Sequence, residues 1–240
     1  MEPVAEPHVE SLRKRLMQKA REDVAVALSA EDLRIAKTAS LIEDLDVISN
    51  ALGEQAASSA KTVPSDELDR VQSIVQSAQQ TRASLMESLE AQMKSYCPNF
   101  SIIATPLIGA KMLREAGSLK RLAMLPSSTI QLLGAKKALF RHLKSKTPPP
   151  KHGFLVAHPK LSSLRPWMKG SAARLIAGKA SIAARADYFG KRDISQQLLQ
   201  EIDAGLKHVL QKAARAPKPL PQQLSFPKHA KGKFFKKKKQ

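Results

Sequence analysis

The segment LDRVQSIVQSAQQTRASLMESL, Leu68–Leu89, decides the fold class of this chain. Its apolar residues recur at alternating spacings of three and four, which is the pattern of a coiled-coil seam. Arg82 takes one place in this seam, as polar residues do where the register of two helices must be fixed. The other places are apolar: Leu68, Val71, Val75, Ala78, Leu85 and Leu89. The segment therefore predicts a long helix that packs against a second one.

An upstream segment supplies the second helix. Apolar residues recur there on a single helical stripe: Leu41, Leu45, Ile48 and Leu52. Gly53 and the Ala/Ser stretch after it loosen this helix. Ser65 or Asp66 then caps the next helix just after Pro64. We expect an antiparallel hairpin with its tip near residues 56–64.

The pattern alone leaves two uses of this hairpin open. It can pack only on itself, or it can also pair with a second protein chain. In the second case, the predicted dimerisation residues are Leu68, Val75, Leu85 and Leu89.

Shorter helices follow the hairpin, which ends at Cys97-Pro98 because proline disfavours helix in the residue before it. The apolar pattern and the Gly and Pro boundaries place these helices at 102–116, 127–133, 135–144, 169–188 and 194–212, with Ser127 or Ser128 as cap of the second. The short apolar run at 154–156 is a strand or a buried loop. The predicted organisation is a helical segment at 1–30, the hairpin at 31–97, a compact helical domain at 98–214 and a disordered Lys/Pro-rich tail at 215–240.

Charge is distributed unevenly along the 240 residues, whose formal net charge is +19. Residues 1–100 hold 11 Lys/Arg and 16 Asp/Glu, a net of −5, whereas residues 101–240 hold 29 and 5, a net of +24. Folding does not need such an excess of positive charge, so it indicates a polyanionic partner. The first part is therefore interpreted as a scaffold and the second as a nucleic-acid surface.

Other classes of function find no support in the sequence. There is no G-x-S-x-G motif, Walker loop or G-x-G-x-x-G after a strand, and the six histidines are scattered. The single Cys97 precludes an internal disulfide and a CxxC metal site. No apolar stretch approaches the roughly 20 residues of a membrane span, and the amino terminus does not have the pattern of a signal peptide. We expect no enzyme, no cofactor, no metal and no membrane contact.

The segment GAKKALFRHLKSKTPPPKHG, Gly134–Gly153, is the most basic part of the folded region. Ala135, Leu139 and Leu143 recur every four residues and predict a helix with an apolar face. Lys136 and Lys137 occupy its first turn, where free N–H groups already carry partial positive charge. A phosphate at this end would relieve the repulsion. The alternative is a solvated basic face without a ligand.

A second basic face lies on the Ala-rich helix near the carboxyl end. Arg174, Gly178, Ser181 and Arg185 fall on one side, with Lys179 beside them. Two guanidinium groups would flank a floor of small residues that a sugar-phosphate backbone can approach. In the alternative interpretation, the small residues allow close helix–helix packing. The residues expected to pack inward are Leu175, Ile176, Ile182 and Ala183.

These segments carry a family resemblance. SIIATPLIGAKMLREAGSLKRLAMLPSSTIQLLGAKKALFRHLKSKTPPPKHG and SAARLIAGKASIAARADYFG closely resemble the Nop domain of box C/D ribonucleoprotein core proteins. EDLRIAKTASLIEDLDVISN is similar to the coiled coil that joins two copies of the family protein. The family includes an archaeal core protein, which this chain resembles most, eukaryotic nucleolar proteins and a spliceosomal pre-mRNA-processing factor.

The resemblance implies an all-α RNA-binding module that recognises kink-turn RNA together with a small ribosomal-type protein bound to it. In guide particles this module positions the 2′-O-methyltransferase fibrillarin for methylation of rRNA or tRNA. The positions that match the family's RNA-facing residues are His152, Arg174, Lys179 and Arg185, and the proline loop also holds Lys151 against RNA. Lys137 and Arg141, which share a face of the basic helix, complete the predicted RNA-binding residues. Further candidates for contact with RNA or a partner are Lys136, Gln131 and His142. A histidine ring on an unpaired base and cations on phosphates suit irregular RNA.

The resemblance also sets expectations for partners and location. Archaeal relatives carry an α/β domain that docks fibrillarin, whereas about thirty residues precede the hairpin here, so we expect weak fibrillarin binding by this sequence alone. The expected location is cytoplasmic for an archaeal protein and nucleolar for a eukaryotic one. Two alternative functions are a general basic nucleic-acid-binding protein and a ribonucleoprotein assembly factor that recruits no methyltransferase.

Overall fold

The computed structural model describes residues 12–21, 31–59, 62–145, 147–190 and 192–212. Within these ranges the chain is helical and forms no strand, which confirms the predicted all-α class. Residues 12–21 form a helix whose side chains are all exposed. The predicted disordered tail at 215–240 lies outside the described residues, as does the rest of the segment at 1–30. No helix in the described ranges has the length and apolar content needed to cross a bilayer.

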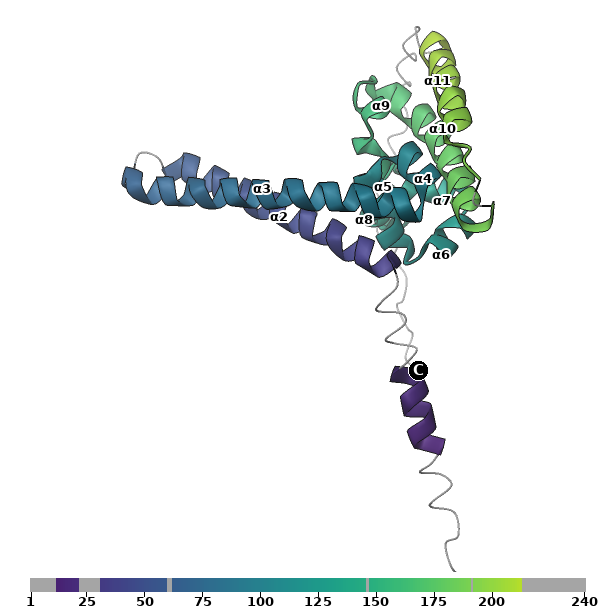
Figure 1. The fold of residues 1–240 in the computed structure, drawn as a ribbon. Coiled ribbons are helices and arrows are strands. Elements are labelled where there is room, and N and C mark those ends of the chain that lie inside the picture. Colours follow the sequence, from purple (N-terminus) through teal and green to yellow (C-terminus); the bar gives the residue numbers. More distant parts are fainter. Residues whose placement is uncertain (1–11, 22–30, 60–61, 146, 191, 213–240) are drawn as a thin grey trace, which may run out of the picture.

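Two long helices form an antiparallel hairpin that extends as an arm from a compact helical body (Figure 1). They are α2 (Glu31–Ser59) and α3 (Ser65–Tyr96). The seam predicted in α3 faces α2, and its residues are half-buried except for Leu89, which is buried. Arg82 forms an ion pair with Asp46 across the hairpin. The polar residue in the seam therefore joins the two helices, as its place in the pattern predicted.

The tip of the hairpin differs from the prediction. Helix α2 runs through the exposed Gly53 to Ser59, because a glycine in a helix with strong neighbours costs only about 1 kcal/mol. Neither Ser65 nor Asp66 caps α3: Pro64 holds the N-cap position and makes no side-chain bond. The proline already sets the extended backbone from which the helix begins.

The apolar stripe predicted for α2 is not its covered face. Leu41 and Ile48 are 53% and 51% exposed. The buried residues of α2 are Ile35, Thr38, Ala39, Ile42 and Ser49. Leu45 and Leu52, the other two residues of the stripe, are half-buried. The stripe is therefore only partly covered, because α2 packs against both α3 and the body and its buried residues lie toward these two neighbours.

The body consists of several short helices and two longer ones near the carboxyl end. They are α4 (Pro98–Ala104), α5 (Pro106–Ala116), α6 (Leu119–Met124), α7 (Ser127–Leu132), α8 (Lys136–Ser145), the 3-10 turn η1 (Phe154–Ala157), α9 (Pro159–Ser162), α10 (Pro166–Arg185), the π-helical turn η2 (Ala186–Gly190) and α11 (Ser195–Lys212). The π-helical turn continues directly from α10.

Several local predictions for the body need correction. The helix expected at 102–116 is two helices, because Thr105 before Pro106 has a φ of 70° and breaks the chain direction. Helices α6 and α9 were not predicted, and the run at 154–156 is a 3-10 turn. Pro126 takes the N-cap position of α7, so neither Ser127 nor Ser128 caps it.

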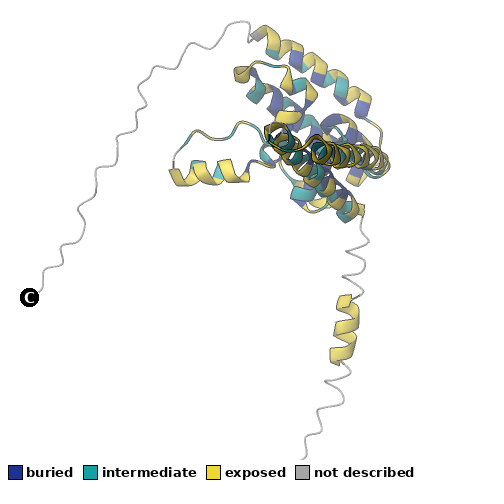
Figure 2. Ribbon diagram, turned by 90° about the vertical axis from the view of Figure 1, so that its left-hand side faces the viewer, coloured by how far each residue is buried: buried dark blue, intermediate teal, exposed yellow. Residues whose placement is uncertain are grey.

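One core serves both the hairpin and the body. Ile35, Ile42 and Met93 from the base of the hairpin belong to the same buried cluster as Phe100 and Leu113. Helix α10 runs through the middle of the body and contacts α4, α6, α7, α9 and α11. Figure 2 shows the buried residues gathered in this body while the free part of the hairpin is largely exposed. The shared core fixes the arm to the body.

An ion-pair cluster strengthens the same junction. Glu43 of α2 contacts Lys111 Nζ at 3.0 Å and Arg114 Nη1 at 2.6 Å, both on α5. Partial burial opposes ionisation of Glu43, but the bonds from Arg114 and Lys111 outweigh it and lower the pKa of this carboxyl. The negative charge of the arm is thus paired where the arm meets the basic body.

Candidate RNA-binding surface

The residues predicted from spacing lie on the exposed face of α10, except at one position. Arg174, Gly178 and Arg185 lie on this face, whereas Ser181 is buried and Ile182 is exposed in its place. A Cβ added at Gly178 would meet no atom within 4 Å. Close helix packing therefore does not explain Gly178, which leaves an open floor between the two arginines. The close packing occurs at Gly205 of α11, against Leu175.

The three cations of this helix have different surroundings. Arg174 is exposed and has no hydrogen-bonding or ion-pair partner in the part of the chain that the structure describes. Arg185 donates from Nε to the carbonyl of Ala123 at 3.1 Å, which ties α10 to α6. Lys179 forms an ion pair with Glu201 of α11. The full charge of Arg174 faces solvent, while Lys179 is largely neutralised.

The proline loop is held in place at its carboxyl end. The side-chain amide of Gln131 donates to the carbonyl of Lys151 at 2.6 Å. The N–H of Gly153 donates to the carbonyl of Gln131 at 2.9 Å, and that of Phe154 to the carbonyl of Leu133 at 2.8 Å. A Cβ at Gly153 would lie 1.8 Å from the Leu133 oxygen, so only glycine allows this approach. Gln131 is thus a positioning residue for the loop.

This anchoring brings the loop to the start of α10. The aliphatic part of Lys151 lies near Gly170, where an added Cβ would be 3.6 Å from two of its carbons. His152 is half-buried and lines a cavity of about 510 Å³ together with Lys111, Gly134 and Phe154. Lys151 and His152 therefore join the surface that Arg174 continues along α10.

Helix α8 stands off the body and has no buried residue (Figure 2). Ala135 just before it is buried, but Leu143 at the other end of the predicted apolar face is 69% exposed and Phe140 is 67% exposed. The prediction of a core-facing helix was wrong because only its first turn reaches the body. Lys137 and Arg141 are exposed on this helix, as expected for binding residues.

Two candidates on α8 already have protein partners. Lys136 Nζ lies 2.5 Å from Glu115 Oε1, so this carboxylate offsets part of the positive charge at the first turn. Nδ1 of His142 donates to the carbonyl of Thr147 in the loop. The two contacts orient α8 and the proline loop relative to the body.

Sequence reasoning missed an aromatic residue at the start of α10. Trp167 precedes Arg174 by seven residues and so falls on the same side of the helix. The guanidinium of Arg165 lies 5.5 Å from the centre of its ring, within cation–π range. The helical spacing could have found Trp167, but the helix was predicted to begin at Lys169, three residues later than Pro166.

The predicted dimerisation residues lie inside the hairpin. Leu68, Val75 and Leu85 are half-buried, and Leu89 belongs to the core and has no surface to offer a second chain. The exposed large apolar residues of the hairpin are Leu41, Val47, Ile48 and Ile74. Dimerisation and its predicted residues stay a prediction: Leu68, Val75 and Leu85 keep part of their surface open, and the four exposed residues offer more of it.

The fold and this surface define a class of protein: an all-α scaffold in which a helical arm is joined to a body with a basic, partly aromatic face. No group of three or more His, Cys, Asp or Glu in the described ranges could hold a metal ion. The family model described as "Nop: snoRNA binding domain, fibrillarin" matches residues 12–208. The chain therefore belongs to the Nop family.

Curated relatives agree with this assignment. An uncharacterised NOP5 family protein of Methanocaldococcus jannaschii is 41% identical over 138 residues, which cover 58% of this chain and 32% of that protein. Nucleolar protein 58 of Schizosaccharomyces pombe is 41% identical over 112 residues, covering 47% and 22%. Nucleolar protein 56 of Caenorhabditis elegans is 35% identical over 146 residues, covering 60% and 30%. The match spans about a third of these relatives' length or less.

A solved structure shares the fold. A chain in the crystal structure of a fibrillarin/Nop5p complex superposes with a TM-score of 0.61 at 25% sequence identity. The superposition covers 86% of this chain and 81% of that one. The similarity therefore includes the arm as well as the body.

Proposed function

We propose that this chain is the RNA-binding scaffold of a box C/D-type ribonucleoprotein. It recognises a kink-turn guide RNA together with the ribosomal-type protein bound to that RNA, and so supports guided 2′-O-methylation of rRNA or tRNA. The proposal rests on one observation above all: the Arg174–Arg185 face of α10 continues into the anchored Lys151–His152 loop, within a chain of the Nop family.

In this proposal each part of the surface has a defined role. The arginines of α10 bind phosphates across the open floor at Gly178, where a backbone can approach without meeting side chains. His152 stacks on an unpaired base beside its cavity, and Lys151 binds an adjoining phosphate. Lys137 and Arg141 on α8 extend the positive surface. The chain supplies no catalytic group, and the methyl transfer belongs to another protein.

The proposed protein partners follow from the relatives. A fibrillarin-type methyltransferase is one, because the structural relative is a chain of a fibrillarin/Nop5p complex. The weak binding of fibrillarin expected for this sequence alone stays a prediction. A second copy of the chain is another partner, and it would bind through the exposed apolar residues of the hairpin.

Binding measurements with three components test the proposal. The chain is titrated into a kink-turn RNA alone, into that RNA with its kink-turn-binding protein, and into a duplex RNA of equal length. We expect strong binding only when RNA and protein are both present. Equal affinity for all three would instead identify a general basic nucleic-acid-binding protein.

A further inference from the structure

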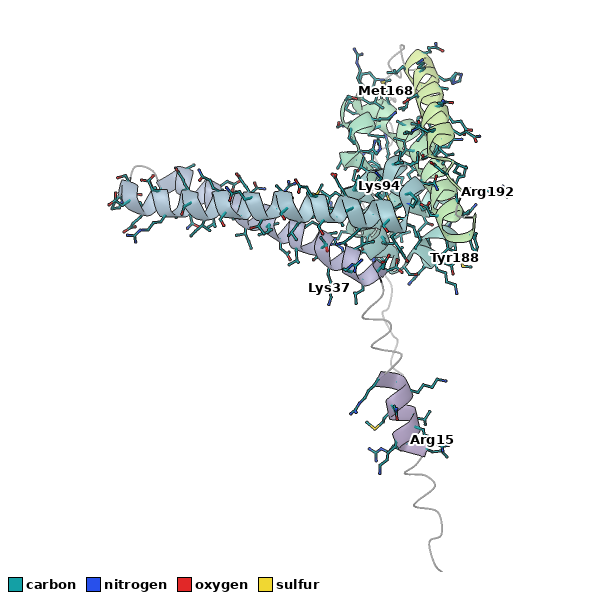
Figure 3. All side chains as sticks on the ribbon, in the orientation of Figure 1. Arg15, Lys37, Lys94, Met168, Tyr188 and Arg192 are labelled. Carbon is teal, nitrogen blue, oxygen red and sulfur yellow. The ribbon has the colours of Figure 1, made fainter. Side chains whose placement is uncertain are left out.

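A second cavity lies where α10 ends, and no residue of it has a role in the surface described above. Helix α10 continues into a π-helical turn at Ala186–Gly190, a rare geometry that is frequent at functional sites. Tyr188 from this turn lines a cavity of about 580 Å³, together with Tyr96, Pro98, Arg192 and two carboxylates, those of Asp187 and Asp193. Figure 3 shows Tyr188 and Arg192 on the same side of the helical body.

The buried carboxylate of Asp187 fixes the π-helical turn to the neighbouring segments. Asp187 Oδ2 accepts from the N–H of Phe100 at 2.8 Å, and Oδ1 accepts from the N–H and the side-chain amide of Asn99 at 3.1 and 2.7 Å. Asn99 also donates to the carbonyl of Arg192 and accepts from the N–H of Ile194, both at 2.8 Å. These bonds join the π-turn, the first turn of α4 and the start of α11, so the floor of the cavity is rigid and Tyr188 is positioned before any ligand arrives.

The π-helical turn presents a second aromatic ring next to Tyr188, outside the cavity lining. The rings of Tyr188 and Phe189 meet edge to face, with centroids 4.7 Å apart. Phe189 is 64% exposed. Large apolar rings at a surface are informative because burial would ordinarily be favourable for them. An exposed aromatic pair beside an arginine is the arrangement that proteins use to stack unpaired bases and hold the adjoining phosphate.

The cavity is continuous with the basic face of α10. Tyr188 follows Arg185 by three residues, and Arg185 is bound to α6 through the carbonyl of Ala123. Helix α6 contacts the π-turn and carries the exposed Lys120 and Arg121. A nucleic-acid strand that passes along α10 from Arg174 to Arg185 therefore reaches Tyr188 next.

We propose that this cavity takes an unpaired base of the RNA bound on α10, with the base stacked on Tyr188 and the adjoining phosphate bound by Arg192. Its volume lies within the roughly 300–1,000 Å³ of ligand pockets in proteins, which leaves ample room for one base. An RNA occupant fits better than a peptide because an aromatic ring and an arginine line the cavity, and the exposed Arg185, Lys120 and Arg121 lie on the helices beside it. The inference rests on the proposed RNA-binding function and adds a second contact to it, at the opposite end of α10 from His152.

Fluorescence of 2-aminopurine tests the stacking directly. A set of kink-turn RNAs carries this base singly at each unpaired position, and each RNA is bound to its kink-turn protein and saturated with the chain. We expect strong quenching at one position in addition to any position that His152 quenches. Tyr188→Leu should abolish that quench, whereas Tyr188→Phe, which keeps the ring, should preserve it. Affinity should fall about 5- to 150-fold with Tyr188→Leu.

The salt dependence separates this contact from the phosphate contacts. Tyr188→Leu removes no charge and should leave the slope of log K against log salt unchanged, whereas Arg174→Ala should flatten the slope and keep the quench at saturation. Absence of a Tyr188-dependent quench at every unpaired position of a bound RNA overturns the inference and leaves the proposed function standing. Tyr188→Phe, which keeps the ring, is the folding control for this comparison. An RNA complex that does not form at all overturns the proposed function first.

Discussion

At the scale of single residues, the contacts that each cation already makes decide how much of its charge remains for RNA. Arg174 has its guanidinium in solvent, Arg185 shares one N–H with the Ala123 carbonyl, and Lys179 faces Glu201. A phosphate that approaches Lys179 must displace the Glu201 carboxylate or bind next to it. The three residues are therefore not equivalent, although the family resemblance treats them alike.

The first prediction compares these residues by salt dependence. Arg174→Ala should lower the slope of log K against log salt by about 0.7–0.9, the value for one phosphate contact. Lys179→Ala should lower it less, because the charge of Lys179 is already paired. Glu201→Gln is the control and should strengthen binding by freeing Lys179. Equal slope changes for Arg174→Ala and Lys179→Ala would show that the ion pair opens in the complex.

The second prediction concerns His158, a buried residue that takes no part in the proposed RNA contacts. Its Nε2–H donates to the carbonyl of Ile103 at 3.1 Å, and its Nδ1 accepts from the N–H of Lys160 at 3.2 Å. Burial lowers the pKa of His158 below its ordinary value of 6.5. The neutral ring is thus the folded form, and its contribution to the free energy of unfolding is complete above pH 6.5.

This contribution should be lost as the pH falls from about 6.5 toward the lower pKa of the folded state, by at most about 1.4 kcal/mol per pH unit. The free energy of unfolding is measured by urea titration between pH 7.5 and 5.5. His158→Asn, which can still cap α9, should show a shallower dependence, whereas His208→Gln on the exposed side of α11 should behave as the wild type. Identical curves for His158→Asn and the wild type would argue against His158 as the titrating group.

At the scale of elements, the proline loop depends on one close backbone approach. Gly153→Ala would force its Cβ against the Leu133 oxygen and break the pairing with α7. We expect a loss of about 1–3 kcal/mol in stability, and weaker RNA binding because Lys151 and His152 are released. Gly178→Ala is the matched control for stability alone: its Cβ meets no atom and should stabilise α10 by about 0.5–1 kcal/mol. Thermal unfolding of both variants and RNA titration of Gly153→Ala check this, and unchanged values for Gly153→Ala would mean that the loop is not held there.

The hairpin gives a second element-scale prediction. Ile48 is exposed on α2, whereas Leu85 packs against the core. If two copies pair through the arm, Ile48→Asp should produce a monomer whose melting temperature matches that of the wild type at concentrations too low for pairing. Leu85→Asp should instead lower the melting temperature, since it places a charge against buried apolar residues. Sedimentation and thermal unfolding distinguish the two variants. A wild-type chain that is monomeric at tens of micromolar would rule out the homodimer.

The sequence predicted elements better than it predicted which side of each is covered. The seam of α3 was correct because its three-four spacing needs only one partner helix, and α2 lies next to it. The stripe at Leu41 and Ile48 was misread because α2 packs against two neighbours, and the second, α5, is joined to it only by tertiary contacts. The site shows the same limit: spacing located Arg174 and Arg185, but Glu201 beside Lys179 lies 22 residues further along the chain. Contacts of that range are not encoded in local periodicity.

At the scale of the whole molecule, charge and shape divide the chain into two regions with different roles. The arm belongs to the part of the sequence with a net charge of −5, and the body to the part with +24. A polyanion is attracted to the body and repelled from the arm, so RNA is steered to one end of an elongated molecule. The ion pairs of Glu43 with Lys111 and Arg114 neutralise the boundary between the two regions.

The last prediction follows from the length of the arm. Helix α3 has 32 residues, so the tip lies about 48 Å from the base at 1.5 Å per residue. This is several times the roughly 10 Å over which charges act at 0.1 M salt. Neutralising Glu54 and Asp69 near the tip, as Glu54→Gln with Asp69→Asn, should therefore leave the affinity for the kink-turn complex unchanged within about twofold. Glu201→Gln on the body removes one negative charge at short range and should raise it. A tip variant that changes affinity as much as Glu201→Gln does would mean that the arm itself touches RNA, and the separation into a binding body and a scaffolding arm would then be wrong.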